Sequence, residues 1–320
     1  MTILFAFGDS ITVGYSSTVP SNAWSAKVAA ARCMTLDNRA VSGNQIQDTA
    51  ARVYSAVVTS SSKSVWLAGY NDYRYCGTNP LWHETYKHGI AAMAVWLAIP
   101  ECAKVRARAA SVSGSWLDTY VYGNNLGKYS NTQNSTLTFQ VSGTVVYVAS
   151  IAMQNPVGGI LGVSIDGVPV GVGHCYGSAP ANSGVGYSPY LMRFDGLAAG
   201  LHTVVVSVES ASAGNVFVDW VAGNSVSGPA VRIAGPLRFK LGCYDASQMP
   251  AFNNGSVEAA DKFNQTTREI AAMLADDGLD VGYVDANSLY APDTGDNDWP
   301  DVHPNDSGHQ HIADAFLGAI

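Results

Sequence analysis

The stretch Ile3-Leu4-Phe5-Ala6-Phe7-Gly8-Asp9-Ser10 decides how the rest of the chain is interpreted. Five apolar residues in a row are typical of a buried strand, and open α/β sheets place their chemistry just beyond the carboxyl ends of such strands. Ser10 is therefore a candidate nucleophile. Taken alone, Gly-Asp-Ser is better explained by an ordinary turn after a strand, so other parts of the chain must decide between these interpretations.

Two more short strands are expected at 34–41 and 64–68, and each leads to a polar segment that contains a glycine. The first leads to Gly43 and the second to Gly69-Tyr70-Asn71-Asp72. Helical spacing of apolar residues over 22–33 and 46–57 alternates with these strands. This alternation predicts a parallel sheet whose functional loops lie at one edge. A polar and aromatic loop at 73–82 and a helix at 83–97 are expected to follow.

The composition changes between about residues 111 and 228, where charge is scarce and Gly, Ser, Asn and Val are abundant. Short alternating runs separated by glycine-rich turns, with a hairpin signal at Asp166-Gly167, predict a β-sandwich. The α/β pattern resumes with a strand at 230–236, a helix at 256–275, a strand at 281–284 and a closing helix at 306–317. We therefore predict one α/β domain, residues 1–102 and 229–320, interrupted by an all-β domain at 103–228.

Charge and hydropathy exclude several classes of partner. Charged residues make up 13% of the chain and the net charge is −8, so no basic stripe is expected to bind nucleic acid or an anionic membrane. The longest apolar run, Ile90 to Ile99, is about half the length of a membrane span.

The first residues lack the basic segment of a signal peptide. We therefore expect synthesis in the cytoplasm, and non-classical export or association with a virion stay open as later destinations. Five scattered cysteines are expected to be free thiols, and no metal-ligand spacing is found.

A second chemical signal lies near the end of the chain, where His303 precedes the closing helix. A serine nucleophile needs a base that accepts its proton near neutral pH, and imidazole has that basicity. A carboxylate must orient the imidazole, and Asp301 is the nearest candidate, with Asp298 second. Acyl transfer also needs hydrogen-bond donors for the oxyanion. The backbone N–H groups of Ser10 and Gly43 and the carboxamide of Asn71 are the candidates, and no cofactor is required.

Taken together, four stretches of this chain resemble the conserved blocks of the SGNH (GDSL) hydrolases. They are Gly8-Asp9-Ser10, Gly43 in its loop, Gly69-Tyr70-Asn71-Asp72, and Asp301-Val302-His303-Pro304-Asn305. The resemblance implies a flavodoxin-like three-layer sandwich with a five-stranded parallel sheet. It also implies a nucleophilic Ser10, an oxyanion hole of Ser10, Gly43 and Asn71, and a catalytic His303 with a nearby Asp.

The chain departs from the family pattern at the acid. The family usually has Asp three residues before its His, and Pro300 occupies that position here. Asp301 lies two residues before His303 and Asp298 lies five before it. Asp301 is the favoured acid, Asp298 is the alternative, and a Ser-His dyad supported by a backbone carbonyl is also open.

Within the insertion, segments such as Gly114-Ser115-Trp116 and Val216 to Trp220 are similar to jelly-roll carbohydrate-binding modules. The side chains of Trp116 and Trp220 are equally consistent with packing in the core and with an exposed surface on which a sugar ring stacks. The combined resemblance implies a serine esterase that removes acetyl groups from a glycan, as phage tail-associated deacetylases and bacterial acetylesterases do. Such a protein acts as a homo-oligomer or as part of a virion tail in some of these settings. The alternatives are a lipid or thioester hydrolase of the same fold and a glycan- or receptor-binding protein with a vestigial site.

Other conspicuous residues have structural explanations. Asp9 and Asp72 are expected to fix their loops by accepting backbone N–H bonds. His309 and His311 are expected to be surface or capping residues. The aromatic residues Tyr70, Tyr73, Tyr75 and Trp82 fit the lining of a pocket and the packing of a loop equally well.

Overall fold

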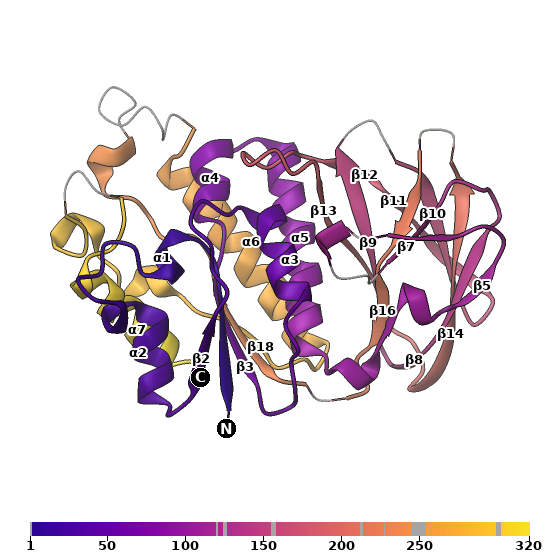
Figure 1. The fold of residues 1–320 in the computed structure, drawn as a ribbon, viewed down its shortest axis with the longest axis horizontal. Helices are drawn as coiled ribbons and strands as arrows, with labels where there is room; N and C mark the ends of the chain where they lie inside the picture. Colours follow the sequence, from indigo (N-terminus) through magenta and orange to yellow (C-terminus); the bar gives the residue numbers. More distant parts are fainter. Residues whose placement is uncertain are drawn as a thin grey trace.

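The computed structural model describes residues 2–119, 121–123, 127–154, 158–211, 214–226, 228–244, 254–298 and 302–320. Figure 1 shows successive layers across the long axis of the molecule. Helices α2 (Trp24–Ala31) and α7 (Asp306–Leu317) lie against one face of a parallel sheet, and α3 (Ile46–Tyr54), α5 (Pro80–Ala98) and α6 (Val257–Asp276) lie against its other face. A β-rich region follows beyond the latter helices. The termini lie close together at the end of the parallel sheet.

The helices and strands have the following bounds. The α-helices are α1 (Ser10–Val13), α2 (Trp24–Ala31), α3 (Ile46–Tyr54), α4 (Tyr70–Cys76), α5 (Pro80–Ala98), α6 (Val257–Asp276) and α7 (Asp306–Leu317). The 3-10 helices are η1 (Pro20–Asn22), η2 (Glu101–Ala103), η3 (Ala107–Ala109), η4 (Val121–Gly123), η5 (Leu241–Tyr244), η7 (Ala286–Ser288) and η8 (Pro292–Thr294). The strands of the parallel sheet are β1 (Ile3–Phe7), β2 (Thr35–Asn38), β3 (Lys63–Leu67), β17 (Ala230–Ala234) and β18 (Val281–Tyr283). The other strands are β4 (Lys104–Arg106), β5 (Ser111–Ser113), β6 (Leu117–Asp118), β7 (Lys128–Ser130), β8 (Thr136–Gly143), β9 (Val146–Gln154), β10 (Ile160–Ile165), β11 (Val168–His174), β12 (Tyr176–Ser178), β13 (Tyr187–Phe194), β14 (Gly200–Ser210), β15 (Val216–Val218) and β16 (Trp220–Gly223).

The predicted five-stranded parallel sheet is present, with the spatial order β18-β17-β3-β1-β2. All four neighbouring pairs are parallel. Strand β1 lies between β2 and β3, and four of its five residues are buried because helices cover both faces of the sheet. The order of the strands reverses at β1 and β3, and in open α/β sheets this reversal leaves a crevice beyond their carboxyl ends.

Helix α5 explains how the β-rich region is attached. Its second half, residues 89–98, is buried on every side, and such an all-round apolar helix belongs in an interior. It packs against α3 and α6 on one side and against β13 on the other. The apolar run Ile90 to Ile99 is therefore the internal layer between the parallel sheet and the β-rich region.

The β-rich region contains two five-stranded sheets, one of order β11-β10-β14-β8-β5 and one built on β9 with β12, β13, β16 and β4. Strand β8 alternates between buried and less buried residues, whereas the first seven residues of β9 are all buried. The predicted hairpin joins β10 to β11, and both turn residues have positive φ, 51° at Asp166 and 81° at Gly167. Trp220 is fully buried, so it belongs to the core. The domain boundaries at 102/103 and 228/229 and the jelly-roll connectivity stay predictions.

The structure corrects the expectation of a loop over 73–82. Residues Tyr70–Cys76 form α4, and α5 begins at Pro80 with Asn79 as its cap. Asn79 accepts a hydrogen bond from the N–H of Leu81, and a proline at the first helical position lacks only a donor that would be unpaired in any helix. Tyr70 and Tyr73 are buried, so they are packing residues of this region.

Two further findings concern the described part of the chain as a whole. None of its helices combines the length and the apolar character needed to cross a membrane. Cys33 and Cys102 are exposed, whereas Cys76, Cys175 and Cys243 are buried.

Candidate active site

The loop after β1 has a backbone that only glycine fits at its first position. Gly8 has a φ of 145°, and a Cβ there would lie 2.7 Å from the carbonyl oxygen of Leu67 on the neighbouring strand. Asp9 follows, and its carboxylate accepts a hydrogen bond of 3.0 Å from the N–H of Ile11. These two devices turn the chain sharply, so that Ser10 begins α1 at the sheet edge.

Ser10 and His303 are 293 positions apart in sequence, and the fold brings their side chains into contact. Ser10 Oγ and His303 Nε2 lie 2.9 Å apart, which is hydrogen-bond distance. The adjacent carbonyl of Val302 accepts a hydrogen bond from the buried hydroxyl of Tyr70. The Tyr15 ring lies over the imidazole, with 4.5 Å between ring centres. Contacts from three loops therefore hold the imidazole against the serine.

The favoured acid, Asp301, lies outside the described residues. Asp298 is described, and its carboxylate accepts a hydrogen bond of 3.0 Å from Nδ2 of Asn305. Asn305 caps α7 through the N–H groups of Ser307 and Gly308. The contact of Asp298 thus supports the start of α7, directly after the histidine loop.

Asn71, in the first turn of α4 after β3, and Gly43, in the loop after β2, lie on either side of Ser10. Asn71 Nδ2 donates to the carbonyl of Asn44 at 3.1 Å, and its Oδ1 accepts a bond of 3.4 Å from Arg74. The carboxamide is therefore turned with its nitrogen towards the Gly43 loop. Gly43 has a φ of 84°, and nothing lies within 4 Å of the position that its Cβ would occupy. Its backbone is open to approach.

Two buried carboxyl groups fix these loops, as expected. Asp9 and Asp72 are each nearly inaccessible to solvent, and Asp72 accepts a hydrogen bond of 3.1 Å from the N–H of Ile46. Burial raises the pKa of each carboxyl to about 7, against the lowering effect of the N–H bonds. Both groups therefore support backbone turns and are poised to change charge near neutral pH.

The expectation for His309 is wrong. This side chain is fully buried, and its Nδ1 accepts a hydrogen bond of 3.4 Å from the N–H of Trp24. Its Nε2 lies 3.1 Å from the carbonyl of Tyr15. Burial lowers its pKa, which suits a neutral ring that accepts at one nitrogen and donates at the other. His309 lies at helical spacing from the buried Ile312, Ala313 and Phe316. This spacing in the sequence could have indicated that His309 is buried.

The sequence interpretation missed Arg74 and Tyr15, because neither belongs to a recognised motif. Arg74 orients Asn71, and Tyr15 covers the His303 ring. His311 bonds to Asp296 at 2.7 Å, so it also supports the loop before α7. Among the described residues, no group of three His, Cys, Asp or Glu side chains is arranged to hold a metal ion.

No protein-family model matches the chain, and no curated protein matches it either. Solved structures give partial matches. A two-domain esterase (CEX) active on acetylated mannans, co-crystallised with mannopentaose, covers 72% of this chain and 91% of its own length at 12% identity and a TM-score of 0.40. The CBM36-1 domain of a multidomain xylanase from the hindgut metagenome of Trinervitermes trinervoides covers 37% of this chain and 92% of its own, at 16% identity and a TM-score of 0.29. The module CsCBM6-3 from Clostridium stercorarium, in complex with cellobiose, covers 37% and 90% at 18% identity and a TM-score of 0.29. TM-scores at this level do not establish a shared fold.

Proposed function

We propose that this chain is a serine esterase of the SGNH (GDSL) type that removes small acyl groups, above all acetyl, from a carbohydrate. The observation that carries the proposal is the 2.9 Å contact between Ser10 Oγ and His303 Nε2 at the carboxyl edge of the parallel sheet. The strand order, equivalent to 2-1-3-4-5, is that of flavodoxin-like sheets, whose ligand crevice lies between the first and third strands. Ser10 follows β1, and Asn71 follows β3.

In the proposed reaction, Ser10 Oγ attacks the ester carbonyl carbon while His303 Nε2 takes the hydroxyl proton. Negative charge develops on the carbonyl oxygen and is stabilised by the N–H groups of Ser10 and Gly43 and by the carboxamide of Asn71. His303 then gives its proton to the leaving sugar oxygen, the ester C–O bond breaks, and an acyl-Ser10 remains. Water then attacks this ester while His303 takes a proton from it, the bond between the acyl carbon and Ser10 Oγ breaks, His303 returns the proton to Ser10 Oγ, and the carboxylic acid is released. Asp301 is the proposed partner that orients His303.

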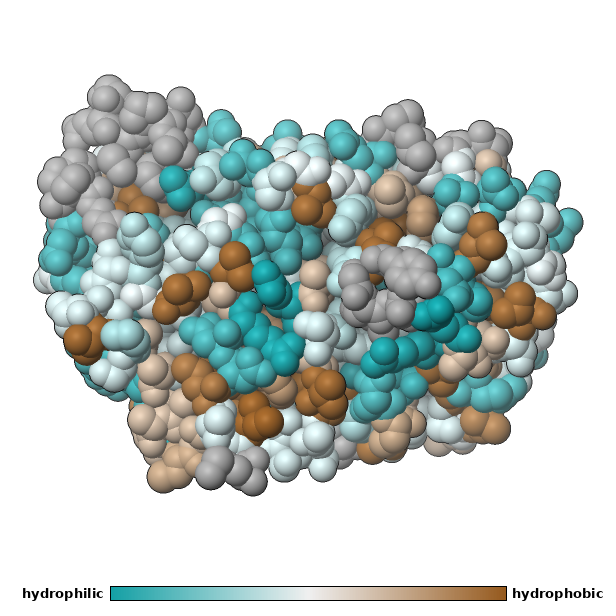
Figure 2. Space-filling model, viewed as in Figure 1, coloured by the Kyte–Doolittle hydropathy of each residue, from teal (hydrophilic) through white to brown (hydrophobic). Residues whose placement is uncertain are grey.

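The surroundings of His303 support a small acyl group. The ring centre of Tyr15 lies 4.5 Å from that of His303, and the ring centre of Tyr70 lies 6.4 Å away. Behind them, Tyr70 packs edge-on against Phe239, so core side chains already fill this side. In Figure 2, the apolar residues on the viewed face form small separate patches among hydrophilic ones. A hydroxyl-rich substrate suits such a surface better than a lipid does. The virion-tail and oligomer expectations rest on the resemblance alone and stay predictions.

The test compares the wild type with Ser10→Ala on p-nitrophenyl acetate and on acetylated polysaccharides, with release of p-nitrophenol and acetate as the readouts. Ser10→Ala is expected to lower kcat by about 10⁴-fold or more, because the nucleophile is lost. Ser60→Ala, at an exposed turn, is the matched control and should retain full activity. Equal activity in Ser10→Ala and the wild type would remove Ser10 from the mechanism. Rates that rise from acetyl to octanoyl esters would favour a lipid or thioester hydrolase.

A further inference from the structure

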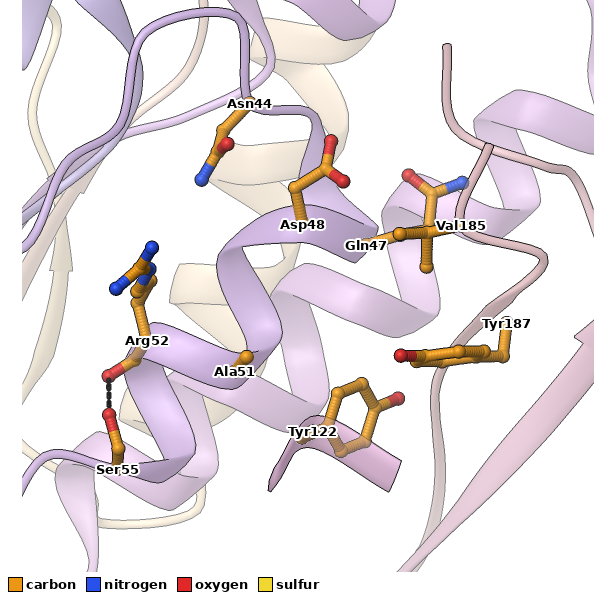
Figure 3. Close-up of a pocket in the computed structure, with 9 residues that line it drawn as sticks. All are labelled: Asn44, Gln47, Asp48, Ala51, Arg52, Ser55, Tyr122, Val185 and Tyr187. Carbon is orange, nitrogen blue, oxygen red and sulfur yellow. Dashed lines mark hydrogen bonds between the residues drawn. The ribbon is translucent and has the colours of Figure 1, made fainter. Parts of the chain in front are cut away.

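A cleft of about 410 Å³ lies between α3 and the β-rich region. This volume is in the range of small-molecule sites, about 300 to 1,000 Å³. Figure 3 shows its lining residues, which include Asn44, Gln47, Asp48, Arg52, Tyr122 and Tyr187. The proposed mechanism uses none of the residues that line this cleft, although Asn44 borders the Gly43 loop.

The cleft begins at the proposed oxyanion loop. Asn44 lines it and directly follows Gly43, and its carbonyl accepts the hydrogen bond from Asn71. The next residue, Gln45, accepts a bond of 2.5 Å from the backbone N–H of Asn182 in the β-rich region. The cleft therefore runs from the edge of the proposed acyl site along the junction with the inserted strands.

Two polar atoms in the lining lack partners. The hydroxyl of Tyr122 and Oε1 of Gln47 are buried and have no hydrogen-bond partner among the described residues. Tyr122 is 7% exposed and Gln47 is 2% exposed. The Gln47 nitrogen is satisfied, because Nε2 donates to the carbonyl of Ala179 at 2.8 Å. Buried polar groups are rarely left unpaired, since each costs about 1–3 kcal/mol, so these two atoms suit a ligand that supplies the missing bonds.

The aromatic side of the cleft is held in a costly backbone conformation. Tyr122 has a φ of 64°, which is unusual for a bulky residue. Its ring packs edge-on against Tyr187, with 5.4 Å between ring centres. Figure 3 shows the two hydroxyl groups on the sides of the rings that face each other. Backbone strain of this kind persists where the surrounding structure enforces it, and it gathers at binding sites.

The charges of the cleft favour a neutral ligand. Asp48 and Arg52 are its two charged residues, and their formal charges cancel. Asp48 is already bound by Ser183 Oγ at 2.5 Å and by the N–H of Gln45 at 3.0 Å. The remaining polar groups are two amides, one serine hydroxyl and two tyrosines, and such groups bind sugar hydroxyls and pack on sugar rings.

We infer that this cleft is a subsite for the neutral sugar units that flank the acylated sugar, with Tyr122 and Gln47 as hydrogen-bonding residues. The inference rests on the proposed function, because it deepens the same site by naming where the rest of the glycan lies.

The test uses the full chain, with Tyr122→Phe and the matched control Tyr54→Phe. Tyr54 also has a buried hydroxyl with no partner among the described residues, but it does not line the cleft. Removing such a hydroxyl costs the fold no hydrogen bond, so both variants are expected to fold. Acetylated glucomannan, acetylated xylan and p-nitrophenyl acetate are the substrates. The ratio of kcat/KM on glycan to kcat/KM on p-nitrophenyl acetate should fall about three- to tenfold in Tyr122→Phe, through KM, and stay unchanged in Tyr54→Phe. An unchanged ratio in Tyr122→Phe would overturn the inference.

A binding measurement separates this inference from the esterase itself. Electrophoresis in gels that contain glucomannan or xylan should retard Ser10→Ala, and adding Ala51→Trp, which fills the cleft, should abolish the retardation. If the wild type releases no acetate but this pattern holds, the esterase fails and the cleft stands as a glycan site. If acetate is released and Ala51→Trp changes neither retardation nor KM, the cleft fails alone. Stronger retardation by acetylated homogalacturonan, which is anionic, would overturn the assignment to a neutral chain.

Discussion

The sheet edge around Ser10 and the cleft between α3 and the β-rich region are built in different ways. At the edge, Ser10 is positioned by short-range devices, namely the Gly8 turn and the Asp9 cap. The buried carboxyls of Asp9 and Asp72 each accept a backbone N–H. In the cleft, residues from distant segments meet through packing and through hydrogen bonds such as that from Gln47 to the carbonyl of Ala179, and buried polar atoms of Gln47 and Tyr122 have no partner among the described residues. The turns held by Asp9 and Asp72 are therefore complete without a ligand, whereas we infer that the cleft is completed by one.

The largest expected effect tests whether the edge carries the chemistry by itself. His303→Gln should lower kcat by about 10⁴- to 10⁶-fold on p-nitrophenyl acetate, because the amide cannot take the proton of Ser10. The thermal midpoint should change little, since the side chain is half-buried at a loop. His174→Gln, on an exposed part of β11, is the control. Activity within tenfold of the wild type would show that the 2.9 Å contact is not catalytic.

The residues of the edge could be predicted because each follows a strand or precedes a helix with a clear local signal. The bounds of α7 agree with the expectation because Asn305 caps the helix and apolar residues recur at helical spacing behind it. Helix α4 was missed because Tyr70-Asn71-Asp72 has the polar and aromatic character of a loop, and the helix forms only when the tyrosines pack into the core. Local patterns thus identified Asn71 but not the helix that carries it.

The cleft could not be predicted, because its residues have no shared pattern in the sequence. Gln47 has the appearance of a solvent-facing helix residue until the segment around Ala179 covers it. Tyr122 meets Tyr187 only after the inserted strands have packed on α3 and α5. Long-range packing of this kind leaves no periodicity to detect.

The next effect sharpens the role of the edge. Asn71→Ala should lower kcat by about 100- to 1,000-fold with a small change in KM, as expected for an oxyanion donor. Asn131→Ala, at an exposed turn of the β-rich region, is the matched control. If KM rises and kcat is unchanged, Asn71 binds the substrate without stabilising the transition state. Asn71 would then have the same kind of role, substrate binding, that we infer for the cleft residues.

The smallest effect concerns stability and is found beside the cleft. Asp219 is buried, and its Oδ2 has no hydrogen-bond partner among the described residues. Burial raises the pKa of the Tyr54 and Tyr122 hydroxyls, and the nearby Asp219 raises both pKa values further. Burial raises the pKa of Asp219 from 3.8 to about 8. The carboxyls of the sheet edge, by contrast, are partly compensated.

Because the folded state holds this proton to higher pH than the unfolded chain does, the contribution of Asp219 to stability is complete below about pH 4. It is lost as the pH rises towards 8. Asp219→Asn keeps the shape of the neutral acid without its titration, so its free energy of unfolding should decline less over this interval. At pH 8.5 the variant should be more stable than the wild type by on the order of 1–3 kcal/mol, measured by urea unfolding at several pH values. Asp276→Asn, exposed at the end of α6, should keep the wild-type slope. Parallel curves for Asp219→Asn and the wild type would mean that Asp219 is compensated, and the contrast between the edge and the cleft would then rest on Gln47 and Tyr122 alone.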